Sequence, residues 1–220
     1  MSALIDLTHI IYPEHTPRKF SVETIGAETV NRNVVRLQGQ WYIMSKISMV
    51  SHIATHIEVP YHLFPDGCDL ASLPLEICFG QAVLLDFTHI QKRVEISLEE
   101  VKEAAERIGG IPEESIVLCN LGYSSRYGTE EYSQSPYFSA GALQWLADSG
   151  MKLMGVDAGG VEIPGSEEHG NHGILFSNRI PLIENVAHLE LLPVSHFQAA
   201  AFPYPIKGVE AFPVRVVAFL

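Results

Sequence analysis

Short apolar runs recur along the chain, and most of them contain β-branched residues and end at turn residues. Runs of this length and composition predict β-strands. The run Met151–Val156, between Gly150 and Asp157, predicts a central strand, whereas Val214–Phe219 predicts a strand that ties the end of the chain into a sheet. The predicted strands are Ala3–Leu7, Glu28–Leu37, Trp41–Val50, Gln81–Phe87, Ser115–Leu121, Met151–Val156 and Val209–Phe219.

Two segments predict α-helices. The sequence Ser97-Leu-Glu-Glu fits a capping box that opens a helix through about Ile108, where Gly109-Gly110 ends it. Ser139 predicts the cap of a second helix, Ala140–Ser149, which a strand follows. Helices that alternate with strands predict an α/β fold, and the closely spaced early strands predict an antiparallel portion. We therefore expect a mixed β-sheet flanked by helices, in a single domain that spans residues 1–220.

Composition and charge narrow the function classes. The chain has 220 residues, 14 Lys and Arg against 26 Asp and Glu, and a formal net charge of −12. This balance argues against a nucleic-acid partner, because the phosphate backbone requires a basic surface. No stretch has the roughly 18 consecutive apolar residues of a membrane span, and the first residues do not resemble an export signal. We therefore expect a cytoplasmic protein with a small-molecule partner.

The three cysteines, Cys68, Cys78 and Cys119, are spaced irregularly along the chain. They form no C-x-x-C pair, so the pattern suggests neither a disulfide framework nor a thiolate zinc site. We expect them to be buried and to behave as small hydrophobic residues.

The densest group of potential ligands lies in His52-Ile-Ala-Thr-His56-Ile-Glu58-Val-Pro-Tyr-His62. A helix would place His52 and His56 on one face, as in H-E-x-x-H zinc sites, but Pro60 follows closely and favours loop or extended backbone. In extended backbone, His56 and Glu58 point to one side and the residue between them points into the core. The alternative is an ordinary polar loop, but three histidines and a carboxylate within eleven positions favour a functional cluster.

Imidazole nitrogens and carboxylate oxygens are natural ligands of a divalent ion such as zinc or manganese, and several must converge because each binds weakly alone. This segment supplies three of them, His52, His56 and Glu58. A catalytic site also requires an open position for water, whose pKa the ion lowers to about 7. His62, with an unperturbed pKa of about 6.5, could then act as general acid or base.

A second, looser group lies in Glu167-Glu168-His169-Gly-Asn-His172 and continues to Glu184 through the apolar stretch Ile180–Ile183. Composition alone favours a charged, glycine-rich surface loop followed by a strand. We therefore expect His169 to lie in a solvated loop, although it could also be an additional ligand.

Three further residues allow two interpretations each. Asp157 ends a predicted strand, where it either positions a ligand histidine or caps a turn. Trp41 and Tyr42 point to opposite faces of a predicted strand, so one of them either lines an aromatic pocket or packs in the core.

With these two groups of ligands, the sequence resembles the cyclase family of metal-dependent hydrolases, which includes bacterial kynurenine formamidase (arylformamidase). The family signature is H-x-G-T-H-x-D-x-P-x-H, and the segment from His52 to His62 keeps every histidine, the threonine and the proline. A second family element, a histidine twelve residues before a glutamate in an I-E-N context, matches His172 and Glu184. Weaker matches lie at Asp6-Leu-Thr8, Leu121-Gly122-Tyr123 and Gly155-Val-Asp157.

The resemblance implies a swivelling β/β/α fold and a site for two divalent ions, for which we expect zinc first and manganese second. His52, His56 and Glu58 would hold one ion. Glu58, His172 and Glu184 would hold the other, so that Glu58 bridges the two.

The implied activity is that of a hydrolase that acts on C–N bonds other than peptide bonds. It would open a small amide, formamide or lactone by metal-activated water, with His62 as the proton shuttle. The resemblance also implies a homodimer or homotetramer, for which the apolar stretch Phe212–Leu220 is either a contact or an ordinary core strand.

Two positions depart from the family signature. Glu58 replaces an aspartate, which moves the carboxylate outward by about 1.5 Å, and Ala54 replaces a glycine, which produces strain if the backbone there requires a positive φ. Gly159-Gly160 and Glu162 also stand where many relatives have a more polar stretch. Two alternatives to the hydrolase therefore stay open: a non-catalytic metal- or small-molecule-binding protein on the same fold, and a structural scaffold without metal.

Overall fold

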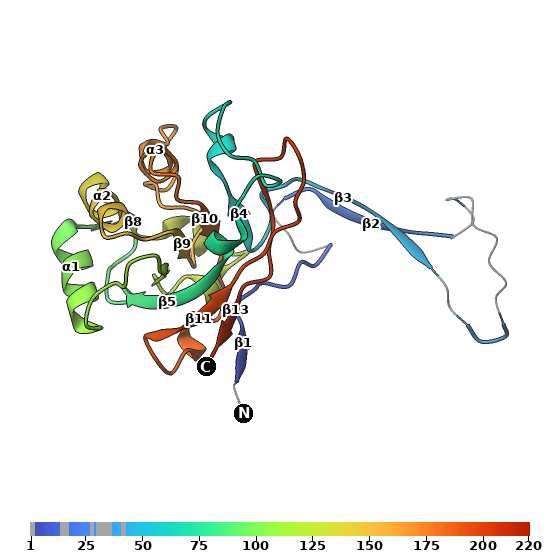
Figure 1. Cartoon of the computed structure of the whole chain (residues 1–220). Helices are drawn as coiled ribbons and strands as arrows, with labels where there is room; N and C mark the ends of the chain where they lie inside the picture. Colours follow the sequence, from blue (N-terminus) through green and yellow to red (C-terminus); the bar gives the residue numbers. More distant parts are fainter. Residues whose placement is uncertain (1–2, 14–17, 27–28, 30–36, 41–42) are drawn as a thin grey trace.

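The fold is built around one curled β-sheet of nine strands, in a computed structural model that describes residues 3–13, 18–26, 29, 37–40 and 43–220 (Figure 1). The strands of this sheet are β1 (Leu4–Asp6), β4 (His56–Glu58), β5 (Phe79–Asp86), β7 (Ile116–Asn120), β9 (Leu153–Val156), β10 (Leu182–Glu184), β11 (His196–Ala200), β12 (Ala211–Pro213) and β13 (Val217–Phe219). Their order is β1-β13-β11-β5-β7-β9-β10-β4-β12. The run from β5 to β10 is parallel and the other neighbours are antiparallel, which confirms the predicted mixed sheet.

The two faces of the sheet bury two separate hydrophobic cores. Helices α1 (Leu98–Arg107), α2 (Ala140–Asp148) and α3 (Gly170–Ser177) cover one face and lie on the same side of the sheet (Figure 1). Because side chains alternate along a strand, Val117 and Cys119 of β7 pack toward the helices, whereas Leu118 packs into the second core. The second core is enclosed by the curl of the sheet itself, so the outermost strands are held by packing as well as by hydrogen bonds.

The helix ends follow the predicted capping residues. Ser97 Oγ accepts a hydrogen bond from the Glu100 backbone N–H, and the Glu100 carboxylate accepts one from the Ser97 N–H, which confirms the capping box of α1. Ser139 also caps α2, because its Oγ accepts a hydrogen bond from the Ala142 N–H. In the described part of the chain, no helix is long and apolar enough to cross a membrane.

The predicted strand Val209–Phe219 is wrong as a single strand. Two strands occupy this stretch, because β12 pairs with β4 while β13 pairs with β1 and β11 at the other end of the sheet. Most of Phe212–Leu220, a candidate contact between copies of the chain, is therefore built into the sheet.

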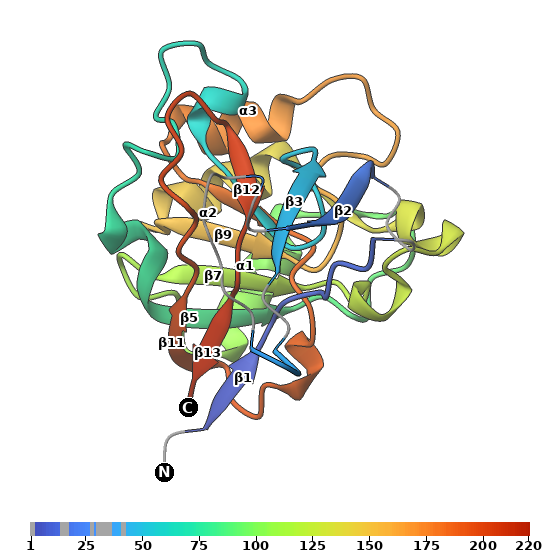
Figure 2. The ribbon, with the colours of Figure 1, turned by 90° about the vertical axis from the view of Figure 1, so that its right-hand side faces the viewer.

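Other predicted strands are confirmed within a few residues as β1, β5, β7 and β9. Trp41–Val50 is confirmed from Met44 onward as β3 (Met44–Met49), which pairs with β2 (Phe20–Ile25) in an antiparallel ribbon that extends away from the sheet (Figures 1 and 2). Trp41 and Tyr42 lie outside the described residues, as does Glu28–Leu37 except for Thr29 and Leu37.

The remaining regular elements are short. Strands β6 (Glu95–Ile96) and β8 (Tyr137–Phe138) form a small parallel pair. Short 3-10 helices occupy several connections: η2 (Pro60–His62), η3 (Leu75–Cys78), η4 (Ser124–Arg126), η5 (Glu130–Gln134) and η6 (Leu189–Leu191). All three cysteines are free thiols; Cys78 and Cys119 are buried as predicted, whereas Cys68 is half-buried.

Asp157 caps the turn that follows β7. Its buried carboxylate accepts hydrogen bonds from three backbone N–H groups, those of Leu121 at 2.7 Å, Tyr123 at 2.8 Å and Ser124 at 3.2 Å. Of the two roles considered for this residue, the geometry is that of turn capping. The carboxylate satisfies donors that would otherwise be buried without a partner.

We expect Asp157→Asn to lower the free energy of unfolding by about 2 to 4 kcal/mol, because an amide NH2 group would replace one accepting oxygen and leave a buried N–H unpaired. Urea unfolding followed by circular dichroism measures this change. Asp148→Asn, at an exposed carboxylate on α2, is the matched control and should change stability by less than about 0.5 kcal/mol. Equal stability of the two variants would contradict the capping role.

Candidate metal centre

Strand β4 places two of the predicted ligands, His56 and Glu58, on one side of the sheet. Ile57 between them is fully buried in the second core, so the extended backbone and alternation predicted for this stretch are confirmed. On the neighbouring strand β10, Glu184 lies directly opposite His56 in the antiparallel register. Because residues that face each other in such a pair point to the same side, Glu184 joins the other two.

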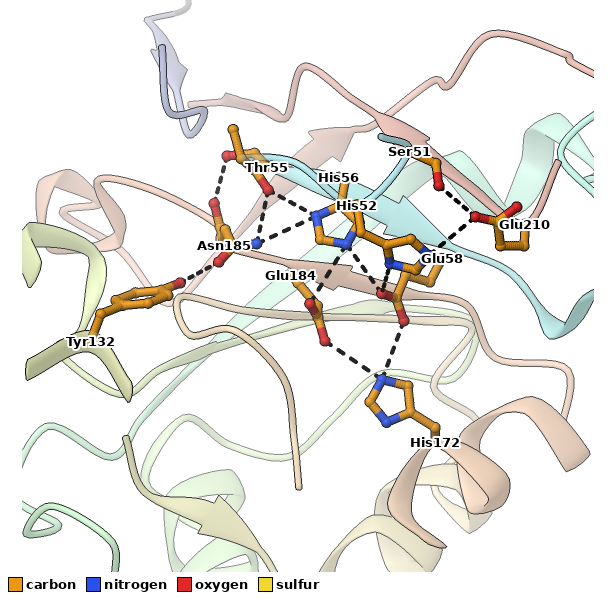
Figure 3. A network of polar contacts seen from close by, with 11 residues as sticks. Ser51, His52, Thr55, His56, Glu58, Tyr132, His172, Glu184, Asn185 and Glu210 are labelled. Carbon is orange, nitrogen blue, oxygen red and sulfur yellow. Dashed lines mark hydrogen bonds and ion pairs between the residues drawn. The ribbon is translucent and has the colours of Figure 1, made fainter. Parts of the chain in front are cut away.

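Two histidines reach the same point from outside the sheet. His52 comes from the loop before β4, and its Nδ1 lies 2.6 Å from Glu58 Oε1, while His56 Nε2 lies 3.1 Å from the same oxygen. His172 comes from the first turn of α3, and its Nε2 lies 3.2 Å from Glu58 Oε2 and 3.5 Å from Glu184 Oε1 (Figure 3). The structure therefore brings the five predicted ligands together around the Glu58 carboxylate.

These five residues form two groups that could each hold an ion. His52, His56 and Glu58 make one, and Glu58, His172 and Glu184 make the other, with the ligand atoms in each group within 4.8 Å of one another. Glu58 belongs to both groups, as a bridging carboxylate must.

His172 lies on a helix, so the surface loop that composition favours for this segment is wrong from Gly170 onward. Helix α3 begins there, and His172 is buried on it. The two glycines of Gly170-Asn-His-Gly173 disfavour a helix locally, but Leu175 and Phe176 pack into the core beneath the sheet and hold it. His169, just before the helix, is exposed as expected, and its ring centroid lies 5.6 Å from that of His172.

Each of the three histidines directs its second ring nitrogen to another acceptor. His56 Nδ1 lies 2.8 Å from the Ala54 carbonyl oxygen. His172 Nδ1 lies 2.9 Å from Glu162 Oε1, and His52 Nε2 lies 3.2 Å from Glu210 Oε1. Contacts of this kind fix the tautomer and orientation of a histidine that binds a metal. The sequence contains Glu162 and Glu210 without any pattern that marks them as neighbours of the ligands.

Asn185, the residue after Glu184, ties the two strands of the site together. Its Nδ2 donates to the Ala54 carbonyl at 2.8 Å, and its own carbonyl accepts from Thr55 Oγ at 2.5 Å. The Tyr132 hydroxyl donates to Asn185 Oδ1. The threonine of the signature is therefore a structural link between the β4 segment and the end of β10 (Figure 3).

The electrostatics of the site favour positive charge at its centre. Burial would raise the pKa of the Glu58 carboxyl, but its contacts with His172, His52 and His56 hold this pKa well below its usual value. For the His172 imidazole the effects have the opposite signs: burial lowers its pKa, but contacts with Glu162, Glu184 and Glu58 raise this pKa to about 11. In addition, Glu58 Oε2 is buried without a hydrogen-bond partner among the described residues. Imidazole nitrogens and carboxylate oxygens that attract positive charge in this way fit a divalent cation.

His62 lies at the edge of the cluster, on η2 directly after β4. Its ring centroid is 4.5 Å from that of His52 and 6.2 Å from that of His172. Partial desolvation lowers the pKa of its imidazole, and the nearby His52 and His172 lower it further, against the opposing effect of Glu58. A neutral imidazole beside the cluster can accept a proton.

The five residues and His62 line a cavity of about 840 Å³. Its walls also include the rings of Tyr127 and Tyr132 and the apolar side chain of Ile163. A cavity of this size, with aromatic walls and a few converging polar groups, suits a small organic molecule.

Comparison with known proteins places this geometry in a family. Residues 5–163 match the model of the family described as "Putative cyclase". The chain is 26% identical over 208 residues to kynurenine formamidase of Bacillus cereus, covering 94% of this chain and 89% of the relative. It is 27% identical over 176 residues to kynurenine formamidase of Bacillus mycoides, covering 79% and 78% of the two chains.

Solved structures share the fold over the whole chain. A predicted metal-dependent hydrolase from Bacillus stearothermophilus has a TM-score of 0.76 and 26% identity and covers 100% of this chain and 98% of its own. Isatin hydrolase A from Labrenzia aggregata, bound to benzyl benzoate, has a TM-score of 0.82 and 23% identity, with coverage of 100% and 94%. These structural similarities support the fold that the family resemblance implies, and they do so independently of the ligand residues.

Ala54, where the family signature has glycine, adopts a φ of 50°. This left-handed conformation strains a residue with a Cβ atom. It also aims the Ala54 carbonyl at both His56 Nδ1 and Asn185 Nδ2, so the strained peptide helps to position a predicted ligand.

We expect Ala54→Gly to be better tolerated than the same change at an unstrained site. Removing the methyl group of the buried Ala199 in β11 should lower the free energy of unfolding by about 2 kcal/mol, through lost burial and added chain entropy. At Ala54, relief of about 1 to 2 kcal/mol of strain should offset most of this loss. Urea unfolding of the two variants checks the difference, and equal losses would show that the Ala54 backbone stores no strain.

Proposed function

The chain belongs to the cyclase family, and from this membership and the cluster around Glu58 we propose that it is a metal-dependent hydrolase that opens a small amide, formamide or lactone. The bond cleaved is a C–N bond other than a peptide bond, or the ester bond of a lactone. The observation that carries the proposal is the Glu58 carboxylate, one oxygen of which faces His52 and His56 while the other faces His172.

Two divalent ions would bind at this carboxylate, one with His52 and His56 and the other with His172 and Glu184. Zinc is the first expectation for a site of imidazole and carboxylate ligands, and manganese is the second. When bound, such ions lower the pKa of a water molecule, polarise a carbonyl group and stabilise the oxyanion that forms from it.

The residues of the chain supply the proton transfers and the positioning. His62 is neutral at pH 7 because its pKa is lowered, so its imidazole can take a proton from the attacking water and deliver it to the leaving nitrogen or oxygen. Asn185 holds the Ala54 carbonyl against His56 and thereby keeps that imidazole in one orientation. Tyr127 and Tyr132 offer aromatic walls for the organic part of the substrate.

The relatives and the cavity together support the proposed substrate class. The names of the relatives denote the hydrolysis of a formamide by kynurenine formamidase and of a cyclic amide by isatin hydrolase. Both are small aromatic amides, which the volume and aromatic walls of the cavity would accommodate.

The expected homodimer or homotetramer and the cytoplasmic location stay predictions.

A non-catalytic binding protein is the second candidate, and the observation that favours it is Glu58 itself. The family signature has aspartate at this position, and a longer carboxylate could bind an ion without the alignment that catalysis requires. Activity of the metal-loaded protein separates the two functions.

We expect protein purified without added metal to contain zinc or manganese by elemental analysis, and to hydrolyse at least one member of a panel of aryl formamides, isatins and aryl lactones. Dialysis against a chelator should remove both metal and activity, and added Zn²⁺ or Mn²⁺ should restore them. Bound metal without hydrolysis of any panel member would support the binding protein, and absence of metal would support the scaffold.

We expect His62→Ala to lower kcat by about 10² to 10⁴, the usual contribution of a general acid or base, while the metal content stays that of the wild type. The activity of the wild type should fall as the pH decreases through an apparent pKa below 6.5, because protonated His62 cannot accept a proton. In His62→Ala this acid limb should disappear or move. His196→Ala, at an exposed histidine on β11, is the control and should keep the wild-type rate and pH profile.

A further inference from the structure

Glu210 lies immediately before β12, far from the other site residues in sequence, and its side chain faces His52 from the outer side of the cluster (Figure 3). Glu210 Oε1 is 3.2 Å from His52 Nε2, while His52 Nδ1 is 2.6 Å from Glu58 Oε1. The imidazole of His52 is therefore held between two carboxylates, one at each ring nitrogen.

The carboxylate of Glu210 is itself fixed in place. Ser51 Oγ donates a hydrogen bond of 2.5 Å to Glu210 Oε1, and the Glu210 carbonyl accepts one of 2.9 Å from the Val59 N–H. On the other side, the Val209 carbonyl accepts from the Leu70 N–H at 3.1 Å. The backbone that carries Glu210 is thus bonded both to the residue after β4 and to the loop that follows η2.

His52 is the ligand that depends most on such a contact. Its side chain is 23% exposed, compared with 2% for His56 and 7% for His172, and it lies in a loop rather than on a strand or helix. A neutral imidazole carries one N–H, and an acceptor at one nitrogen draws the proton there and leaves a lone pair on the other. Both nitrogens of His52 face such an acceptor, Glu58 Oε1 at Nδ1 and Glu210 Oε1 at Nε2. When an ion takes the lone pair of Nδ1, the N–H must lie on Nε2, where Glu210 can accept it.

We propose that Glu210 is a positioning residue, which holds His52 in the Nε2–H tautomer and in the orientation that presents Nδ1 to a divalent ion beside Glu58. This inference rests on the proposed metal site. Glu210 acts through His52 and requires no contact with the ion or the substrate. Ser51 holds Glu210 in turn, so the chain Ser51–Glu210–His52 connects the end of β3, the start of β12 and the metal centre.

The test is titration of metal-free protein with Zn²⁺ and with Co²⁺, in competition with a chromophoric chelator. Glu210→Ala should weaken one of the two binding events by about 10- to 100-fold and change the visible spectrum of the Co²⁺-loaded protein, as loss of an outer carboxylate does at other metal sites. Glu210→Gln keeps an accepting oxygen, so it should lose less than about tenfold. Ser51→Ala, which removes a single hydroxyl, should shift affinity in the same direction.

A second readout reports the tautomer directly. Long-range ¹H–¹⁵N NMR spectra of the zinc-loaded wild type should show His52 with Nε2 protonated, and in zinc-loaded Glu210→Ala this N–H should exchange faster with water because its acceptor is gone. The matched control is Glu190→Ala, because Glu190 also faces a histidine, His188 at 3.7 Å, but does not line the cavity. The control should bind metal as the wild type does.

The outcomes separate this inference from the proposed function. If the wild type binds both ions and the Glu210 and Ser51 variants, folded by circular dichroism, match its affinity and spectra, the positioning role is overturned while the metal site stands. If the wild type binds neither ion, the metal site fails, and the role of Glu210 fails with it. Should Glu210→Ala not fold, the Glu210→Gln and Ser51→Ala variants decide the question by the same measurements.

Discussion

The burial of one carboxylate, that of Glu58, is the constraint on which the site depends. An ionised carboxylate with 3% of its side chain exposed is stable only where positive charge or several hydrogen-bond donors surround it. Three imidazoles from a loop, a strand and a helix converge on its two oxygens. Each of these imidazoles has its own outer acceptor, so the need to satisfy one buried charge extends through the Ala54 carbonyl, Glu162 and Glu210 to the surrounding elements.

The position of that carboxylate follows from packing on the opposite face of the same strand. Ile57 is fully buried in the core enclosed by the curl of the sheet, and the period of two along a strand then forces His56 and Glu58 to the other side. Strand β4 lies between β10 and β12, so its register also sets where Glu184 and Glu210 emerge. A shift of one residue in this pairing would turn the ligands into the core. The register that buries Ile57 is therefore the same register that brings the ligands together.

From the residues alone, the sequence predicts the parts of the site that depend on neighbours along the chain, whereas His172 and Glu184 were predicted from the family resemblance. The alternation from Thr55 to Glu58 and the effect of Pro60 are local, and they indicated extended backbone correctly. Helix α3 was missed, because its glycines disfavour a helix and only its packing against the sheet stabilises it. The division of residues 209–219 into two strands, and with it the place of Glu210, depends on which distant strands pair, and no local pattern records that choice.

The charges around the cluster bear on how many ions it would hold. Glu58, Glu184, Glu162 and Glu210 bring four negative charges to three histidines, and neutral histidines are the form that binds a metal. Two divalent ions would balance these four charges, whereas a single ion would leave two of them uncompensated in a largely buried site. The two outer carboxylates would therefore, beyond orienting His172 and His52, favour a pair of ions over a single one. In that arrangement the Glu58 carboxylate already presents one oxygen to each ligand group.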